Sequence, residues 1–245
     1  VGTGYRWYSI LFNRRVYEHR KTAERHELEY NFSLLAAVGC SFERYPGPVL
    51  SYSREHSQAA GQLRSELGIA NDDHVIILHP GSGGSARDWK PGNFALLAHE
   101  LRKKKYRVLI TGGPGEERLV ETVVSAAGAG VIPLVNRLGL KELAAFLARA
   151  DLFISNSTGP LHIAAAVGTP VIGFYPPILA CSPQRWGPYT DRKFVFVPDR
   201  NKCPRCQGGP CEADDCMEQI EVGRVVQEVE RLVPMKRNNL AEVHS

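Results

Sequence analysis

Glycine-rich stretches with polar or charged side chains recur along this sequence, and their residue types suit a phosphorylated ligand. The first is HPGSGGSARDWKPGNF, residues 79–94, which contains Ser82, Gly83 and Arg87. Small residues let the backbone approach a ligand closely, and a guanidinium offers a fork of donors that fits phosphate oxygens. The stretch lacks the Gly-Lys-Ser/Thr ending of a Walker motif. A loop used only for close packing would also be rich in glycine, so both interpretations stay open.

The second stretch is TGGPGEERL, residues 111–119, in which Glu116 stands where a helix should begin. A carboxylate at a helix start is favoured by the helix dipole whatever its function. The alternative is that Glu116 accepts hydrogen bonds from the hydroxyls of a nucleotide ribose.

The third stretch, NSTGPLH, residues 156–162, precedes an alanine-rich apolar segment. Pro160 is tolerated in the first turn of a helix, so we expect Thr158 and Gly159 to form a cap region with outward-facing N–H donors. His162 follows about one turn later and could return to the same pocket. The alternative is a structural histidine in an apolar helix.

The three stretches lie between apolar runs, which we predict to be strands, and amphipathic segments, which we predict to be helices. We predict strands at 75–80, 107–113, 131–135, 151–156, 170–175 and 193–198, and helices at 94–104, 116–127, 140–149 and 159–167. Such alternation is typical of βαβ units, and continuous Val/Ile/Leu runs suit strands covered on both faces. We therefore predict a Rossmann-like, doubly wound parallel sheet over residues 71–233. The three stretches should meet at the carboxyl ends of its strands.

The first 70 residues have a different pattern. Residues 6–20 and 27–39 are helical in pattern, and a polar helix ends near Gly68. We interpret residues 1–70 as the end of a preceding α/β domain plus a linker over residues 67–74. Residues 234–245 are predicted to be a polar tail.

Composition limits the classes of function. The chain has 245 residues, 43% hydrophobic residues and a formal charge of +4, which is too small to favour nucleic acid as a partner. It contains neither a signal peptide pattern nor a long apolar run, so we expect a cytoplasmic protein. Residues 7–26 are rich in aromatic and basic side chains. Either the aromatic side chains are core contacts, or the basic side chains of this segment contact anionic groups.

A cysteine cluster, CPRCQGGPCEADDC, contains Cys203, Cys206, Cys211 and Cys216. Four cysteines are enough to hold a structural zinc ion, although the second pair is spaced unusually. Reduced packing cysteines and disulfides are the alternatives. We predict no metal and no cofactor in the ligand site itself.

Together these residues resemble the ADP-heptose:lipopolysaccharide heptosyltransferases, a family of inverting glycosyltransferases with the two-domain GT-B fold. The resemblance rests on NSTGPLHIAAAVGTPVIGFY, HPGSGGSARDWKPGNFALLA, TGGPGEE and the late cysteines, and it spans nearly all of residues 73–232. It implies a complete C-terminal Rossmann-like domain after the remnant of an N-terminal α/β domain. It also implies an ADP-sugar donor, a lipid-linked acceptor such as the lipopolysaccharide inner core, and peripheral contact with the inner face of the bacterial inner membrane.

The resemblance also implies roles for individual residues. Ser82, Gly83 and Arg87 would contact the donor diphosphate, and Glu116 would contact the ribose. The diphosphate-sugar site would be lined by Ser157, Thr158, Gly159 and His162. Two positions depart from the family pattern, since Arg87 stands where Lys is frequent and Ser157 where Asp is frequent.

An inverting transfer needs a general base for the acceptor hydroxyl and donors that stabilise the charge on the departing diphosphate, here without a metal ion. The resemblance implies an Asp base in a Gly-rich loop of the first domain, and no such loop occurs in residues 1–70. We therefore expect this chain alone to bind donor weakly and to transfer poorly. Rival interpretations are a GT-B transferase for another nucleotide sugar and a non-catalytic nucleotide-sugar-binding module.

Overall fold

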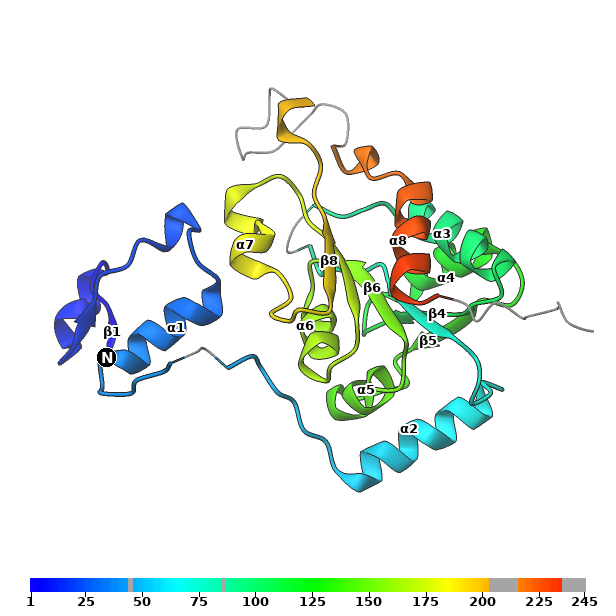
Figure 1. The fold of residues 1–245 in the computed structure, drawn as a ribbon, viewed down its shortest axis with the longest axis horizontal. Helices are drawn as coiled ribbons and strands as arrows, with labels where there is room; N and C mark the ends of the chain where they lie inside the picture. The colour runs from blue at the N-terminus through cyan, green and yellow to red at the C-terminus, as the bar shows by residue number, and fades with distance from the viewer. Residues whose placement is uncertain (44–45, 85–86, 203–215, 235–245) are drawn as a thin grey trace, which may run out of the picture.

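The computed structural model describes residues 1–43, 46–84, 87–202 and 216–234, and its centre is a parallel six-stranded sheet (Figure 1). The strand order is β5-β4-β3-β6-β7-β8, and every neighbouring pair is parallel. The strands are β3 (Val75–His79), β4 (Arg107–Gly112), β5 (Ile132–Val135), β6 (Leu152–Asn156), β7 (Val171–Phe174) and β8 (Lys193–Phe196). The predicted doubly wound sheet is confirmed.

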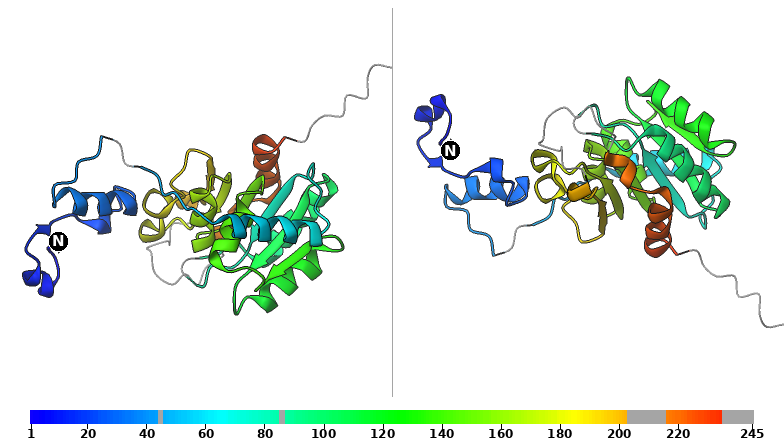
Figure 2. Two further views of the ribbon diagram at one scale, coloured as in Figure 1. Left: turned by 90° about the horizontal axis from the view of Figure 1, so that it is seen from below. Right: turned by 90° about the horizontal axis from the view of Figure 1, so that it is seen from above.

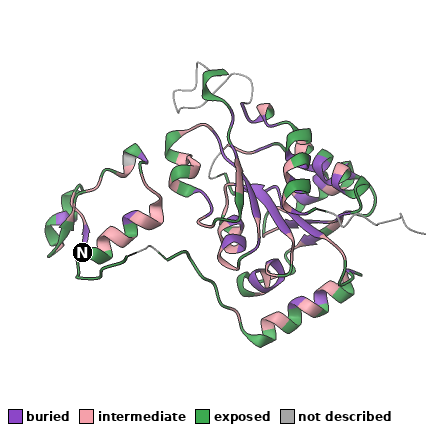
Figure 3. Cartoon of the chain, viewed as in Figure 1, coloured by how far each residue is buried: buried purple, intermediate pink, exposed green. Residues whose placement is uncertain are grey.

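Helices cover both faces of this sheet, which is why its strands are mostly apolar (Figures 1 and 3). Side chains alternate along β3: Ile76 and Leu78 pack with residues of α3, α4 and α8, whereas Val75 and Ile77 pack with residues of α2, α5 and α6. The helices are α2 (Arg54–Glu66), α3 (Pro91–Lys103), α4 (Glu117–Ala127), α5 (Leu140–Leu147), α6 (Gly159–Ala166) and α8 (Val222–Leu232).

The strand order places a ligand crevice in the middle of the sheet. The chain runs outward in one direction from β3 to β4 and β5, then returns to β6 on the other side of β3 and continues to β7 and β8. The loops after β3 and β6 therefore diverge, and a cleft opens between them at the carboxyl ends of these strands. The loop after β3 carries the first glycine-rich stretch, and the loop after β6 carries the third.

Residues 1–43 form a small N-terminal segment to one side of the sheet, next to α7 (Figure 2). They contain a parallel pair of two-residue strands, and η1 is an exposed 3₁₀ helix. The elements are β1 (Gly2–Thr3), η1 (Trp7–Leu11), β2 (Arg15–Val16), η2 (Arg20–Thr22) and α1 (Glu27–Ala36). The helical prediction for residues 6–20 is therefore wrong, because a short apolar segment without a packing surface does not sustain an α-helix. The prediction for 27–39 is confirmed.

Polar contacts attach α1 to the segment after β7, which contains η3 (Leu179–Cys181) and α7 (Pro183–Trp186). His26 caps α1 by accepting from the Leu28 N–H at 3.1 Å, and its Nε2 lies 2.8 Å from the Gly187 carbonyl oxygen. Because Nδ1 accepts, Nε2 carries the proton and donates to Gly187. Arg185 donates to Glu27 at 2.9 Å.

The helix α2 packs on α5 rather than on the N-terminal segment. Its Ala60 and Leu63 are buried in the core on that face of the sheet, and Arg64 donates to the Arg149 carbonyl at 2.9 Å. The predicted domain boundary near residue 70 stays a prediction. The helix α2 precedes that boundary in the sequence, yet its buried residues belong to the core beneath the sheet.

The C-terminal part continues through η4 (Arg200–Lys202), η5 (Cys216–Gln219) and α8. Cys216 is buried in the core with Met217. Cys203, Cys206 and Cys211 lie outside the described residues, as does the predicted tail beyond Pro234, so the zinc, reduced-thiol and disulfide interpretations all stay predictions. None of the helices in the described ranges is both long and apolar enough to cross a lipid bilayer.

Candidate ligand-binding site

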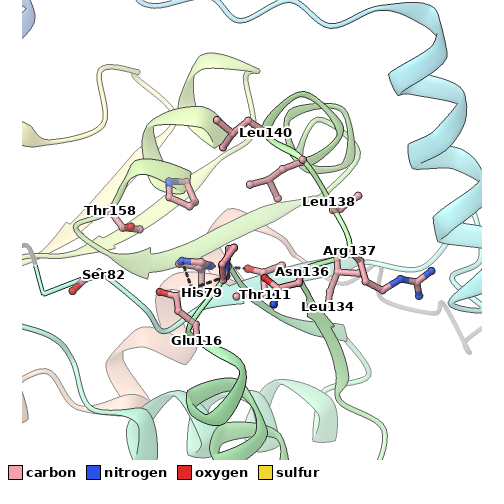
Figure 4. A pocket seen from close by; sticks show the side chains of 17 residues that line it. His79, Ser82, Thr111, Glu116, Leu134, Asn136, Arg137, Leu138, Leu140 and Thr158 are labelled. Carbon is pink, nitrogen blue, oxygen red and sulfur yellow. Dashed lines mark hydrogen bonds and ion pairs between the residues drawn. The ribbon is translucent and has the colours of Figure 1, made fainter.

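A cavity of about 730 Å³ lies at the carboxyl ends of the strands, where the sequence placed a ligand site (Figure 4). It is bordered by the ends of β3, β4 and β5 and by the starts of α4, α5 and α6. Its lining comprises His79, Ser82, Gly83, Thr111, Gly112, Gly113, Pro114, Glu116, Leu134, Asn136, Arg137, Leu138, Gly139, Leu140, Leu143, Thr158 and Pro160. A cavity of this size accepts a ligand as large as a nucleotide.

The polar end of the cavity contains a histidine and a carboxylate in close approach. His79 Nδ1 lies 3.0 Å from the Thr111 hydroxyl, and its Nε2 lies 3.6 Å from Glu116 Oε2. Burial lowers the pKa of His79, and the neighbouring Glu116 carboxylate and the Thr111 hydrogen bond oppose this only in part. His79 is therefore neutral near pH 7, and the charge at this end of the cavity is that of Glu116.

Glycine neighbours hold the Glu116 carboxylate in place. Its Oε2 accepts the Gly113 N–H at 2.7 Å, and a Cβ atom at Gly81 would overlap the carboxylate. Glu116 stands at the N-cap of α4, yet its side chain makes no capping hydrogen bond to the helix. The carboxylate thus lies against the loop after β3 and remains an acceptor for a hydroxyl-bearing ligand.

The loop after β3 brings backbone atoms to the cavity edge. Gly83 and Gly84 have φ values of +62° and +75°, a conformation that side-chain-bearing residues rarely adopt. The Ser82 hydroxyl accepts the Gly84 N–H at 3.2 Å and donates to Asp88 at 2.8 Å. The sequence predicted Ser82 and Gly83 at a ligand site, and both line the cavity.

The start of α6 also faces the cavity, through Thr158 and Pro160. Thr158 is the N-cap residue, and its side chain makes no capping hydrogen bond. Helix N-termini attract anions because their first N–H groups lack partners within the helix and because the helix dipole is positive there. The arrangement suits a phosphate group close to Thr158.

The other end of the cavity is apolar. Leu134, Leu138 and Leu140 line it (Figure 4), and Leu143 of α5 is also part of the cavity lining. Asn136 lies between the polar and apolar ends in the left-handed conformation, with a φ of 52°, and its amide donates to Glu117. Arg137 borders the same end and forms an ion pair with Glu66 of α2 at 2.9 Å. An apolar wall beside polar groups suits a planar aromatic base.

The remaining predicted residues are not among those that line the cavity. Arg87 is half-buried, and Gly159 is exposed. Ser157 forms a hydrogen bond with Tyr175, whose pKa burial raises far above the ordinary value. Burial and, to a smaller extent, nearby His26 lower the pKa of His162, which places that histidine near the N-terminal segment. Their roles in binding stay predictions.

Sequence reasoning missed several lining residues. His79 ends the apolar run VIILH, and a polar residue at the carboxyl end of a buried strand is the signal that could have found it. Asn136 follows β5 directly and carries the same signal. The described residues contain no cluster of three or more His, Cys, Asp or Glu side chains that could hold a metal ion.

Two solved glycosyltransferases share the fold of this chain. A family 9 glycosyl transferase from Veillonella parvula superimposes with a TM-score of 0.78 at 23% identity, over 91% of this chain and 64% of that chain. The E. coli heptosyltransferase WaaC with ADP superimposes with a TM-score of 0.62 at 20% identity, over 91% of this chain and 61% of that chain. The predicted GT-B type of α/β fold is confirmed at the level of the fold.

Curated relatives come from the same group of enzymes. A Haemophilus influenzae protein provisionally named a glycosyltransferase is 34% identical over 80% of this chain and 60% of its own length. Lipopolysaccharide heptosyltransferase 3 of E. coli is 29% identical over 70% of this chain and 49% of its own length. The chain thus spans about half to three fifths of the length of these two relatives.

The family model for glycosyltransferase family 9 (heptosyltransferase) matches residues 1–216. This match includes the N-terminal segment, the helix α2 and every strand that borders the cavity. The resemblance seen in the glycine-rich stretches therefore extends over most of the chain, and the protein belongs to glycosyltransferase family 9.

Proposed function

We propose that this chain is the donor-binding part of a heptosyltransferase and that its cavity binds ADP-heptose. The observation that carries the proposal is the spatial order of chemical groups along the cavity, from apolar to polar. An apolar leucine wall suits adenine, Glu116 suits the ribose hydroxyls, and the glycine loop and the start of α6 suit a diphosphate.

In this proposal the chain stabilises the leaving group. An acceptor hydroxyl attacks the anomeric carbon of the heptose from the face opposite the diphosphate, so the configuration inverts, and its proton passes to the general base that the family resemblance implies, an Asp of the first domain. As the glycosidic bond breaks, the diphosphate gains negative charge, which the N-terminus of α6 and the backbone N–H groups near Gly83 stabilise. Arg87 and His162, which resemble diphosphate contacts of the family, stay proposed contacts. We propose the lipopolysaccharide inner core, at the inner face of the membrane, as the acceptor of the whole enzyme.

Calorimetric titration of the chain with ADP, UDP and GDP tests this proposal. We expect ADP to bind more tightly than UDP and GDP, and we expect EDTA to leave the ADP affinity unchanged because protein N–H groups hold the diphosphate. Absence of ADP binding contradicts the donor-site proposal, and a preference for UDP contradicts the adenine assignment. An unchanged ADP affinity in Arg87→Ala removes Arg87 from the site.

A further inference from the structure

Asn156, at the end of β6, is fully buried and connects two distant points of the loop after β3. Its Oδ1 accepts the Trp89 N–H at 2.8 Å, and its Nδ2 donates to the Pro80 carbonyl at 2.8 Å and to the Trp89 carbonyl at 3.4 Å. An N–H can only donate and a carbonyl can only accept, so these partners fix the orientation of the amide. The Asn156 side chain therefore connects Pro80 and Trp89, the two ends of the loop after β3.

The loop needs such a connection because its own sequence gives it little rigidity. Gly83 and Gly84 adopt left-handed conformations, and glycine loses more conformational freedom on folding than other residues. Fixing the two ends of a loop reduces the number of conformations that its middle can adopt.

The second end of the loop is itself anchored in the core. The Trp89 indole donates to the Ile220 carbonyl at 2.9 Å, and its ring lies 4.3 Å from the Phe174 ring, centroid to centroid. Trp89 is fully buried. The Asn156 amide thus ties Pro80, directly after β3, to Trp89, just before α3.

We propose that Asn156 is a positioning residue of the donor site, which holds Pro80 and Trp89 so that Ser82 and Gly83 face the cavity. Asn156 does not line the cavity, so it acts on a ligand only through this loop. The inference rests on the proposed function, because there Ser82 and Gly83 contact the donor diphosphate. Asn156 is the first residue of the third glycine-rich stretch, but it is not among the residues predicted to contact the ligand.

The substitution Asn156→Asp tests the proposal because it keeps the shape of the side chain and replaces the amide donor by an ionisable carboxyl oxygen. An ionised carboxylate still accepts from Trp89 N–H but repels the Pro80 carbonyl, whereas a protonated carboxyl group can donate to that carbonyl. We expect the variant to bind ADP about tenfold more weakly than the wild type at pH 8. The ratio of the two affinities should return towards one as the pH falls to 5, because a buried carboxyl group takes up a proton readily.

Thr169→Val is the matched control. Thr169 is also buried, and its hydroxyl makes one hydrogen bond, to the Leu147 carbonyl at 2.7 Å, at the amino-terminal edge of the sheet. Its loss should lower the melting temperature and leave the ADP affinity unchanged at both pH values. If Asn156→Asp binds ADP as the wild type does at pH 8, or if its weaker binding is independent of pH, the proposal is overturned.

Hydrogen exchange separates this inference from the proposed function, since it needs no ligand. The Trp89 amide should be protected in the wild type and exchange at least tenfold faster in Asn156→Ala, while the amides of β4 exchange as before. Equal protection of Trp89 in both proteins overturns the inference even if ADP binds. If the wild type does not bind ADP, the donor-site proposal fails, and the exchange rates still decide whether Asn156 holds the loop.

Discussion

His79 Nε2 faces Glu116 Oε2 across 3.6 Å at the polar end of the cavity. Thr111 holds the other ring nitrogen of His79, and Gly113 holds the carboxylate. A proton on Nε2 would complete an ion pair, but burial opposes the charged imidazole and lowers the pKa of His79. The pair therefore links the charge state of the cavity to pH.

The first prediction concerns stability and pH. The pKa values of His79 and His162 are both lowered, so between those values and about 6.5 the unfolded chain binds more protons than the folded chain. The free energy of unfolding should be greatest above about pH 6.5 and fall as the pH decreases. Urea denaturation at pH 8, 7, 6 and 5 measures it. His79→Gln should reduce the slope, by at most about 1.4 kcal/mol per pH unit. A slope identical to that of the wild type contradicts the prediction.

The second prediction concerns Glu116. Glu116→Gln keeps an oxygen for the Gly113 N–H and loses the negative charge, so hydrogen bonds from ribose hydroxyls weaken. We expect ADP affinity to fall about tenfold and pyrophosphate affinity to stay constant or rise. Titration calorimetry with both ligands measures this. Glu121→Gln, at an exposed position further along α4, is the control. A parallel loss for ADP and pyrophosphate would show that Glu116 does not act at the ribose.

The third prediction concerns the apolar wall. Leu143→Ala removes methyl groups from the end of the cavity that suits the base, so the ADP affinity should fall roughly fivefold, which corresponds to about 1 kcal/mol of apolar contact. Pyrophosphate has no base and should bind equally to both proteins. Leu96→Ala, at a half-exposed position on α3 outside the cavity lining, is the control. Equal ADP affinities in wild type and Leu143→Ala would place the base elsewhere.

The fourth prediction concerns Trp89. Trp89→Phe keeps an aromatic ring beside Phe174 but removes the indole N–H that donates to the buried Ile220 carbonyl. We expect the free energy of unfolding to fall by about 1–3 kcal/mol. Trp186→Phe removes a similar bond, to the Ala180 carbonyl at 3.0 Å, at a position that is 38% exposed. Water replaces that bond, so its effect should stay below about 0.5 kcal/mol. Equal effects on denaturant midpoints would contradict the prediction.

The sheet could be predicted from sequence because its strands are buried on both faces. Runs such as VIILH and LFISN carry that burial in their composition, and the amphipathic segments between them became α3, α4, α5 and α6. The residues 6–20 were predicted wrongly, because Trp7, Ile10 and Leu11 are apolar but exposed. Helical pattern alone does not show whether a surface exists to cover an apolar face.

The site residues that lie in strand-to-helix turns could be predicted, because the place of such a turn in the sequence determines where it lies on the sheet. Ser82, Gly83, Glu116 and Thr158 occupy strand-to-helix turns, and such turns must lie at one edge of a parallel sheet. The direction of a side chain one helical turn further on depends on how the helix rotates against its neighbours. His162 was placed by helical spacing and by the family resemblance; it lies near His26 and is not among the residues that line the cavity, so its role in binding stays a prediction.

The path of α8 has a practical consequence for these measurements. Leu232 and Pro234 border His74 and Gly168 at the amino-terminal edge of the sheet, whereas the cavity opens at the carboxyl-terminal edge. A surface tether or a fluorophore attached beside Pro234 therefore sits on the far side of the molecule from the cavity. In a surface-binding experiment, protein attached at this point leaves the opening of the cavity facing the solution, so the surface does not block a nucleotide from entering the cavity.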